Sequence, residues 1–149
     1  FMQIDVGYPD IDAERQIMAR TTSVSEDIPA KVMDVDALIK AQKLIREVPA
    51  SESVAEAILA IVRAGRPDGS DIKDVQKNVS WGPGPRAAQA LMFGVRARAA
   101  IEGRIAPSVE DVLVLAHPIL RHRMALTFSA RAEGVTLASI IDRICERVG

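Results

Sequence analysis

The stretch 82–104, GPGPRAAQALMFGVRARAAIEGR, predicts a long helix in the middle of the chain. Residues 85–101 are dominated by Ala, Leu and Arg, which favour helical backbone. Pro85 suits the first helical position, because the N–H that proline lacks would have no intrahelical partner there. Gly103 is a typical residue just past a helix end. The sequence therefore predicts a helix over 85–101, directly behind Gly82 and Gly84.

Arg86 stands in the first turn of this helix, where the helix dipole places partial positive charge. An arginine there costs a few tenths of a kcal/mol unless something negative compensates it. Free backbone N–H groups at a helix start bind anions, and Gly82 and Gly84 allow a close approach. A guanidinium fork also suits phosphate oxygens. The motif by itself leaves solvent, a carboxylate and a bound phosphate open as the partner of Arg86.

Apolar spacing and capping residues predict five further helices. Asp34 is a plausible N-cap, and Ser108 with Asp111 resembles a capping box. The six predicted helices span residues 10–20, 34–48, 51–65, 85–101, 108–118 and 137–148. The apolar residues expected to make contacts in the first two and the last of them are Ile11, Ile17, Met18, Val35, Leu38, Ile39, Ile45, Ile140, Ile141 and Ile144.

The first six residues, FMQIDV, alternate apolar and polar side chains like a half-buried strand. A lone strand is unstable in water, and nothing later in the chain offers it a partner. We therefore expect it to belong to a sheet upstream of Phe1, in a longer protein from which this chain is a piece. Gly7 and Pro9 end the strand, and residues 65–78 are expected to form a surface loop.

Composition narrows the class of protein. The 149 residues are 48% hydrophobic, with few aromatic side chains, which favours a single all-α domain. With 19 basic and 20 acidic residues, the charge balance argues against nucleic-acid binding. No run reaches the roughly 18 apolar residues of a membrane span. Cys145 is the only cysteine, so no internal disulfide can form, and a cytoplasmic location fits best.

Common catalytic motifs are missing from these 149 residues. They contain no GxxxxGK[ST] phosphate loop, no HExxH and no GxSxG. His117 and His122 lie five residues apart, which is not one helix face, so we predict no metal site. Cys145 shares its helix with three isoleucines and is expected to be an inert core thiol.

Several segments in order carry a family resemblance. They are IDVGYPDIDAERQIM (4–18), GPGPRAAQAL (82–91), RARAAIEGR (96–104), PSVEDVLVLAHPILRHRMAL (107–126) and AEGVTLASIIDRI (132–144). Together they resemble the C-terminal lid of the MoxR family of AAA+ ATPases. The resemblance implies an all-α bundle of about six helices for residues 9–149. Residues 1–8 would then be the end of the core domain's last strand and the hinge.

For function, the resemblance implies a parent protein that hydrolyses ATP with Mg²⁺ in a ring of identical subunits. Members of the family act as chaperones or remodelling factors, some in cofactor or metal insertion, and often work with von Willebrand factor A domain proteins. The nucleotide motifs would lie in the core, so we expect these residues alone to be inactive. A helical protein-interaction module without a nucleotide role is the alternative.

The resemblance also implies site residues. Arg86 matches the sensor-2 arginine, which reaches the ATP phosphates from the lid and supports catalysis. Gly84 stands where the family usually has serine, and Pro85 completes this contact region. Tyr8 and Pro9 would lie close to the adenine, or they form a plain domain-boundary turn. Residues 120–123, Leu-Arg-His-Arg, match a family phrase with no assigned chemistry, for which a structural or subunit-contact role is expected.

Overall fold

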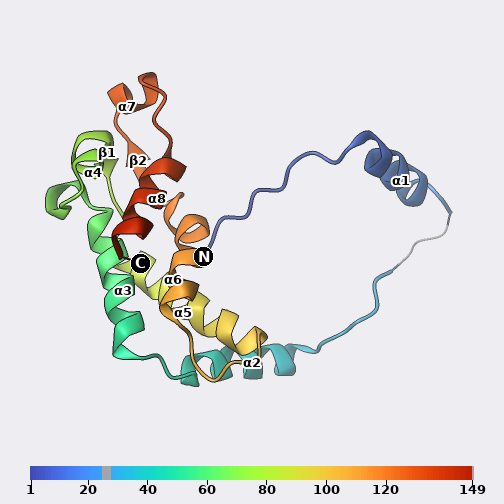
Figure 1. Cartoon of the computed structure of the whole chain (residues 1–149). Helices are drawn as coiled ribbons and strands as arrows, with labels where there is room; N and C mark the ends of the chain where they lie inside the picture. Colours follow the sequence, from blue (N-terminus) through green and yellow to red (C-terminus); the bar gives the residue numbers. More distant parts are fainter. Residues whose placement is uncertain (25–27, 149) are drawn as a thin grey trace.

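The computed structural model describes residues 1–24 and 28–148. A helical body lies on one side, and the N-terminal third of the chain loops out from it and returns through α2 (Figure 1). The helices of the described residues are α1 (Ile11–Thr21), α2 (Val35–Glu47), α3 (Glu52–Ala64), α4 (Lys73–Asn78), α5 (Pro85–Ile101), α6 (Val109–Leu120), α7 (Phe128–Ala132) and α8 (Leu137–Val148), with a 3-10 turn η1 (Pro67–Gly69) and two short strands, β1 (Val79–Trp81) and β2 (Ala125–Leu126).

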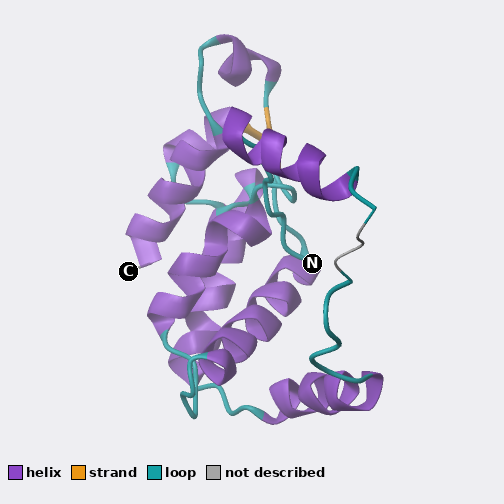
Figure 2. Ribbon diagram, turned by 90° about the vertical axis from the view of Figure 1, so that its right-hand side faces the viewer, coloured by secondary structure: helices purple, strands orange, loops and turns teal. Residues whose placement is uncertain are grey.

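The core lies between α3, α5, α6 and α8, which Figure 2 shows as the closely packed part of the molecule. Small residues on the buried face of α5 let α6 come close. A Cβ built on Gly94 would lie 3.0 Å from Leu115 Cδ1. The largest fully buried side chains include Ile61, Leu91, Ile119, Leu120, Ile140, Ile141 and Ile144. The predicted all-α bundle is confirmed.

All six predicted helices are present, with bounds within two residues of the prediction, but the number of about six was too low. Two short helices, α4 and α7, occupy segments that were not predicted to be helical, and α4 interrupts the expected loop over 65–78. The helix expected to close or kink at Pro118 continues to Leu120. Pro118 lacks only its own N–H donor, and beyond it Arg121 N–H still bonds His117 O at 3.2 Å.

Residues 1–10 contain neither helix nor strand. The strand expected over residues 1–6 was to pair with a sheet outside this chain, so it stays a prediction. The backbone of residues 1–10 is extended and is joined to α6 by one bond, from Gln3 N–H to Pro118 O at 2.7 Å. Arg121 also pairs with Asp5 at 2.5 Å. A strand needs a neighbouring strand for its ladder, and no described residue supplies one.

The expected burial of the first two helices was also wrong. Neither α1 nor α2 contains a buried residue, and Ile17 and Leu38 are each about half exposed, at 51% and 50%. α2 lies against α5, with Ile45 half-buried and the Arg46 guanidinium 4.9 Å from the Phe93 ring centroid. The apolar spacing predicted these two helices correctly, but it did not predict that their apolar side chains stay largely exposed. No helix within the two described ranges combines the length and apolarity needed to cross a membrane.

Candidate functional site

The start of α5 is held by close contact between two turns. A Cβ on Gly82 would lie 2.2 Å from Gly65 O and 2.8 Å from Arg66 Cα, so only glycine fits without a backbone shift. The Arg66 Nε–H donates to Pro83 O at 2.9 Å and ties the same two turns together. These contacts fix the direction in which the helix leaves the turn.

Gly84 is the N-cap of α5 and meets no such constraint. Its φ is −88°, and a Cβ there would meet no atom within 4 Å. A glycine N-cap has no side chain to accept from the first-turn N–H groups. Pro85 follows at the first helical position, as predicted. The helix start is therefore open on the side where Arg86 emerges.

Two short strands bring a second segment to this helix start. β1 and β2 are antiparallel, with Val79 opposite Leu126 and Trp81 opposite Ala125. The residues before β2 consequently lie beside the residues after β1. One open pocket is formed by both segments and is lined by Trp81, Gly82, Gly84, Pro85, Arg86, Ala87, His122 and Arg123.

The pocket is positive, and no carboxylate lines it. Arg86 is exposed and forms no ion pair or side-chain hydrogen bond with the residues described. Desolvation and then the positive charges of Arg123 and Arg121 lower the pKa of His122. Of the three partners open to Arg86, a carboxylate is thus not found in residues 1–24 or 28–148, which leaves solvent or an added anion.

Tyr8 and Pro9 lie apart from this pocket. Tyr8 is fully exposed, on the extended segment that leads from the body to α1, and neither residue lines the pocket that contains Arg86. The described residues bring Gly84, Pro85 and Arg86 together, but not the Tyr-Pro turn with them.

The remaining candidate groups have other partners or surroundings. His117 Nε2 lies 2.8 Å from Asp142 Oδ1, away from His122. Within residues 1–24 and 28–148, no cluster of three or more histidine, cysteine or acidic side chains could hold a metal ion. Burial, followed by the charges of Asp142 and Glu146, raises the pKa of the Cys145 thiol to about 11. That thiol is a poor nucleophile at neutral pH, as expected.

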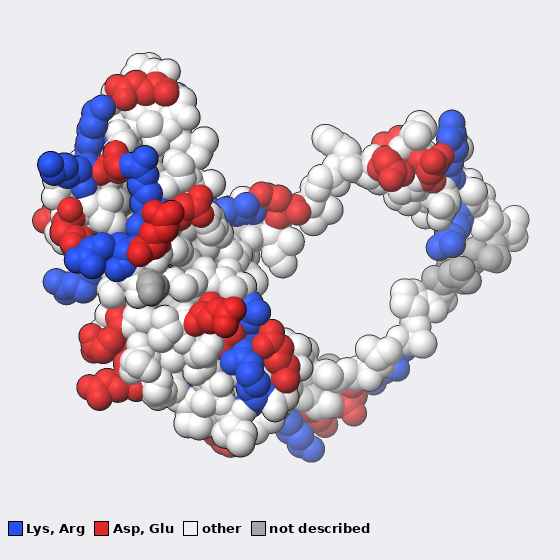
Figure 3. All heavy atoms as spheres, viewed as in Figure 1, with Lys and Arg blue, Asp and Glu red and all other residues white. Residues whose placement is uncertain are grey.

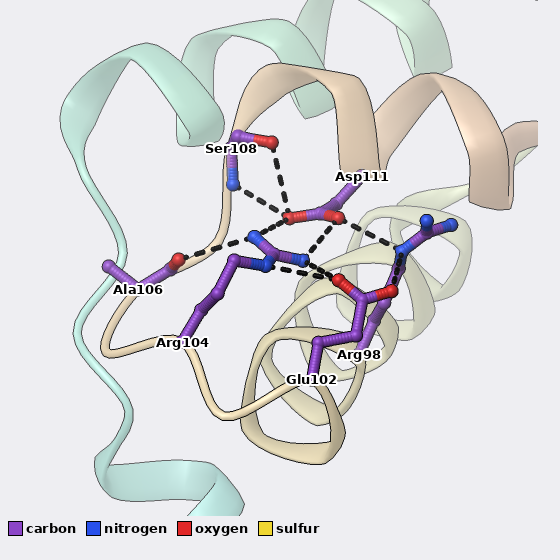
Figure 4. Close-up of polar contacts among 6 residues, drawn as sticks. All are labelled: Arg98, Glu102, Arg104, Ala106, Ser108 and Asp111. Atoms are coloured by element: carbon purple, nitrogen blue, oxygen red, sulfur yellow. Dashed lines mark hydrogen bonds and ion pairs between the residues drawn. The ribbon is translucent and has the colours of Figure 1, made fainter.

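A charged cluster at the far end of α5 fixes its angle to α6 (Figure 4). Asp111, whose side chain is 4% exposed, accepts from Arg104 Nη1 and Nη2 at 2.8 and 2.7 Å and from Ser108 N–H at 2.8 Å. Arg98 Nε lies 3.1 Å from the same carboxylate. The predicted pair of Ser108 and Asp111 is confirmed, whereas the two arginines were not anticipated.

Sequence reasoning also missed Arg123 as a neighbour of Arg86. The two residues are brought together by a pairing of very short strands, VSW (79–81) with AL (125–126). Strands of two or three residues carry no usable period-two pattern. The only signal in the sequence was the family phrase at 120–123, where Leu120 is buried and Arg121 binds Asp5.

Comparison with known proteins gives consistent matches. Residues 72–144 match the family described as AAA lid domain. The chain is 27% identical over 147 residues to the chaperone MoxR1 of Mycobacterium tuberculosis, covering 98% of this chain and 39% of that protein. It is 28% identical over 147 residues to the uncharacterized protein YeaC of Bacillus subtilis, covering 98% and 43%.

A solved structure agrees in fold over almost the whole chain. It is a protein from Cytophaga hutchinsonii described as an ATPase, with a TM-score of 0.86 and 28% identity, covering 99% of this chain and 46% of that one. This chain therefore spans less than half the length of each of these three proteins.

The helical bundle and the matched segment together define the class: residues 72–144 form an AAA lid domain. More particularly, almost the whole chain is similar to part of the MoxR1 chaperone, which points to the MoxR type of AAA+ ATPase lid.

Proposed function

We propose that this chain is the lid of a larger AAA+ ATPase and that Arg86 contacts the phosphates of ATP held by the core of that protein. The observation that supports this most directly is the unpaired Arg86 in a carboxylate-free pocket at the start of α5. A positive group fixed beside a developing negative charge lowers the barrier to phosphoryl transfer. Gly84 and Pro85 shape the backbone next to the phosphates.

The finer parts of the proposal follow from the same family. We infer that Mg²⁺ accompanies ATP in the core, that identical subunits form a ring in the cytoplasm, and that the ATPase remodels proteins or serves cofactor or metal insertion. A von Willebrand factor A domain protein is the proposed partner. Tyr8 and Pro9, on the exposed segment before α1, would meet the adenine once the core is in place.

The first experiment replaces Arg86 with alanine in the full-length protein. We expect ATP turnover to fall on the order of 100-fold, as it does when a preorganised charge is removed from a transition state. Arg86 has no partner within the lid residues described, so the melting temperature should hardly change. Arg131→Ala, which removes an exposed arginine on α7, is the matched control. Unchanged turnover in Arg86→Ala would remove this residue from the mechanism.

A second experiment concerns these 149 residues by themselves. Titration calorimetry with ATP should detect weak binding or none, because one arginine and a helix start supply only part of a phosphoryl-transfer site. Micromolar affinity would show that the nucleotide site lies within the lid and would contradict the proposal.

A helical interaction module remains the second candidate, and the exposed apolar face of α2 favours it. Val35, Leu38 and Ile39, which share this face, are between 43% and 70% exposed. The gene that encodes the parent protein distinguishes the two candidates. A GxxxxGK[ST] motif about 200 residues before Phe1, roughly the size of one domain, supports the ATPase lid, and its absence leaves the interaction module.

A further inference from the structure

Arg123 approaches the pocket of Arg86 from a different part of the fold. It lies between the end of α6 and β2, and the pairing of β2 with β1 carries it to the start of α5. Its Nη1–H donates to Ile119 O at 2.6 Å, one of the carbonyls at the end of α6. The side chain is half-buried, so its guanidinium is held in place more firmly than a surface arginine.

The same Nη1 also contacts His122 Nε2, and these two contacts together use only part of the donor capacity of Arg123, leaving Nε and Nη2 without a partner among the described residues. A guanidinium carries five N–H donors, and the described residues supply no carboxylate for Arg123. Several other arginines do have one: Arg98 and Arg104 pair with Asp111, and Arg121 pairs with Asp5. Arg86 and Arg123, which come from separate parts of the fold, thus line one pocket, and no carboxylate in its lining balances their positive charges.

Two guanidinium groups in one pocket repel each other unless an anion lies between or beside them. An anion with several oxygens at different angles can bind both forks, and a phosphate chain has this form. Burial and then the charges of Arg123 and Arg121 lower the pKa of His122, which agrees with a positive pocket.

We propose that Arg123 is a second cationic contact to the same polyphosphate that Arg86 binds. This inference rests on the proposed function, since it takes the nucleotide phosphates as the anion. With this contact, three residues of the segment 120–123 have separate roles. Leu120 packs in the core, Arg121 holds the N-terminal segment through Asp5, and Arg123 faces the ligand.

The test measures the Kd for ATP in the presence of Mg²⁺ on the full-length protein. Arg123→Gln removes the charge but keeps an N–H that can reach Ile119 O, and we expect Kd to rise about tenfold, as for loss of one charge-assisted contact. Arg123→Lys keeps the charge and should stay within about threefold of the parent. Arg131→Ala should leave Kd unchanged. Melting temperatures of all variants report whether the lid still folds.

The outcomes separate this inference from the proposed function. If Arg86→Ala weakens ATP binding while Arg123→Gln does not, the lid function stands and the second contact is overturned. Equal weakening in Arg123→Gln and Arg123→Lys, together with a lower melting temperature, would show a structural role and would also overturn it. If Arg86→Ala leaves both Kd and turnover unchanged, the proposed function itself fails.

Discussion

At the scale of single residues, the start of α5 contains two glycines that are there for different reasons. Gly82 is needed because the turn at Gly65 and Arg66 leaves no room for a Cβ at this position. Gly84 has open space around it and an ordinary extended backbone, so a residue with a side chain can stand at this position. The packing of the two turns, and not glycine flexibility, positions Arg86.

This difference predicts opposite effects of two small substitutions. Gly82→Ala should destabilise the chain by about 1–3 kcal/mol, because its Cβ would overlap the Gly65 carbonyl and force a backbone shift. Gly84→Ser should stabilise it by a few tenths of a kcal/mol, because serine is a better N-cap than glycine. Urea denaturation of both variants provides the measurement. Equal stability of Gly82→Ala and the parent chain would contradict the close approach of the two turns.

At the scale of secondary-structure elements, the corner between α5 and α6 depends on Asp111. Arg104, the largest influence, holds the pKa of this carboxyl below its ordinary value, and the Ser108 N–H lowers it further against the effect of burial. The same contacts raise the pKa of Arg104, so that it stays charged at every accessible pH. The carboxylate joins the end of one helix to the cap of the next.

Asp111→Asn should lower stability by about 2 kcal/mol at pH 7, since it removes the charge from the hydrogen bonds with Arg104 and from the ion pair with Arg98. Because the folded-state pKa is lowered, the contribution of the carboxylate is complete above the unfolded pKa and is lost as the pH falls through the folded value. Thermal unfolding at pH 7 and near pH 2 should therefore show a gap between variant and parent that shrinks in acid. A gap independent of pH would contradict this account.

At the scale of the whole molecule, the described residues divide into a packed body and an exposed N-terminal segment. The buried residues all belong to the part of the chain from Val54 onward, whereas residues 1–10, α1 and α2 bury none. Charges of both signs are interspersed on the face shown in Figure 3, with no extended patch of one sign. Stability of this chain should therefore reside in the body.

One matched pair of substitutions checks this division. Ile61→Ala in α3, where the side chain is fully buried, should cost about 2–5 kcal/mol. Ile39→Ala in α2, where the side chain is 43% exposed, should change stability by no more than about 0.5 kcal/mol. Denaturant unfolding of the 149-residue chain measures both. A large loss in Ile39→Ala would mean that α2 packs against the body more closely than described.

The sequence by itself determined the helices of the body and their caps. Apolar spacing and a capping residue such as Ser108 act within one or two turns, so their effect can be predicted without knowing the rest of the fold. The sequence also indicated that Arg86 requires a negatively charged or solvent partner, because the helix dipole places partial positive charge at the helix start.

The tertiary structure alone decided what surrounds these elements. Three features depend on how the helices and strands pack: Arg123 and Arg86 line one pocket, Gly82 lies against Gly65, and Arg104 hydrogen-bonds Asp111. Likewise, the apolar stripe of α2 predicted a helix but not its exposure, because burial depends on which surface lies opposite. Local preferences act between near neighbours, whereas a pocket forms only when distant segments are packed together.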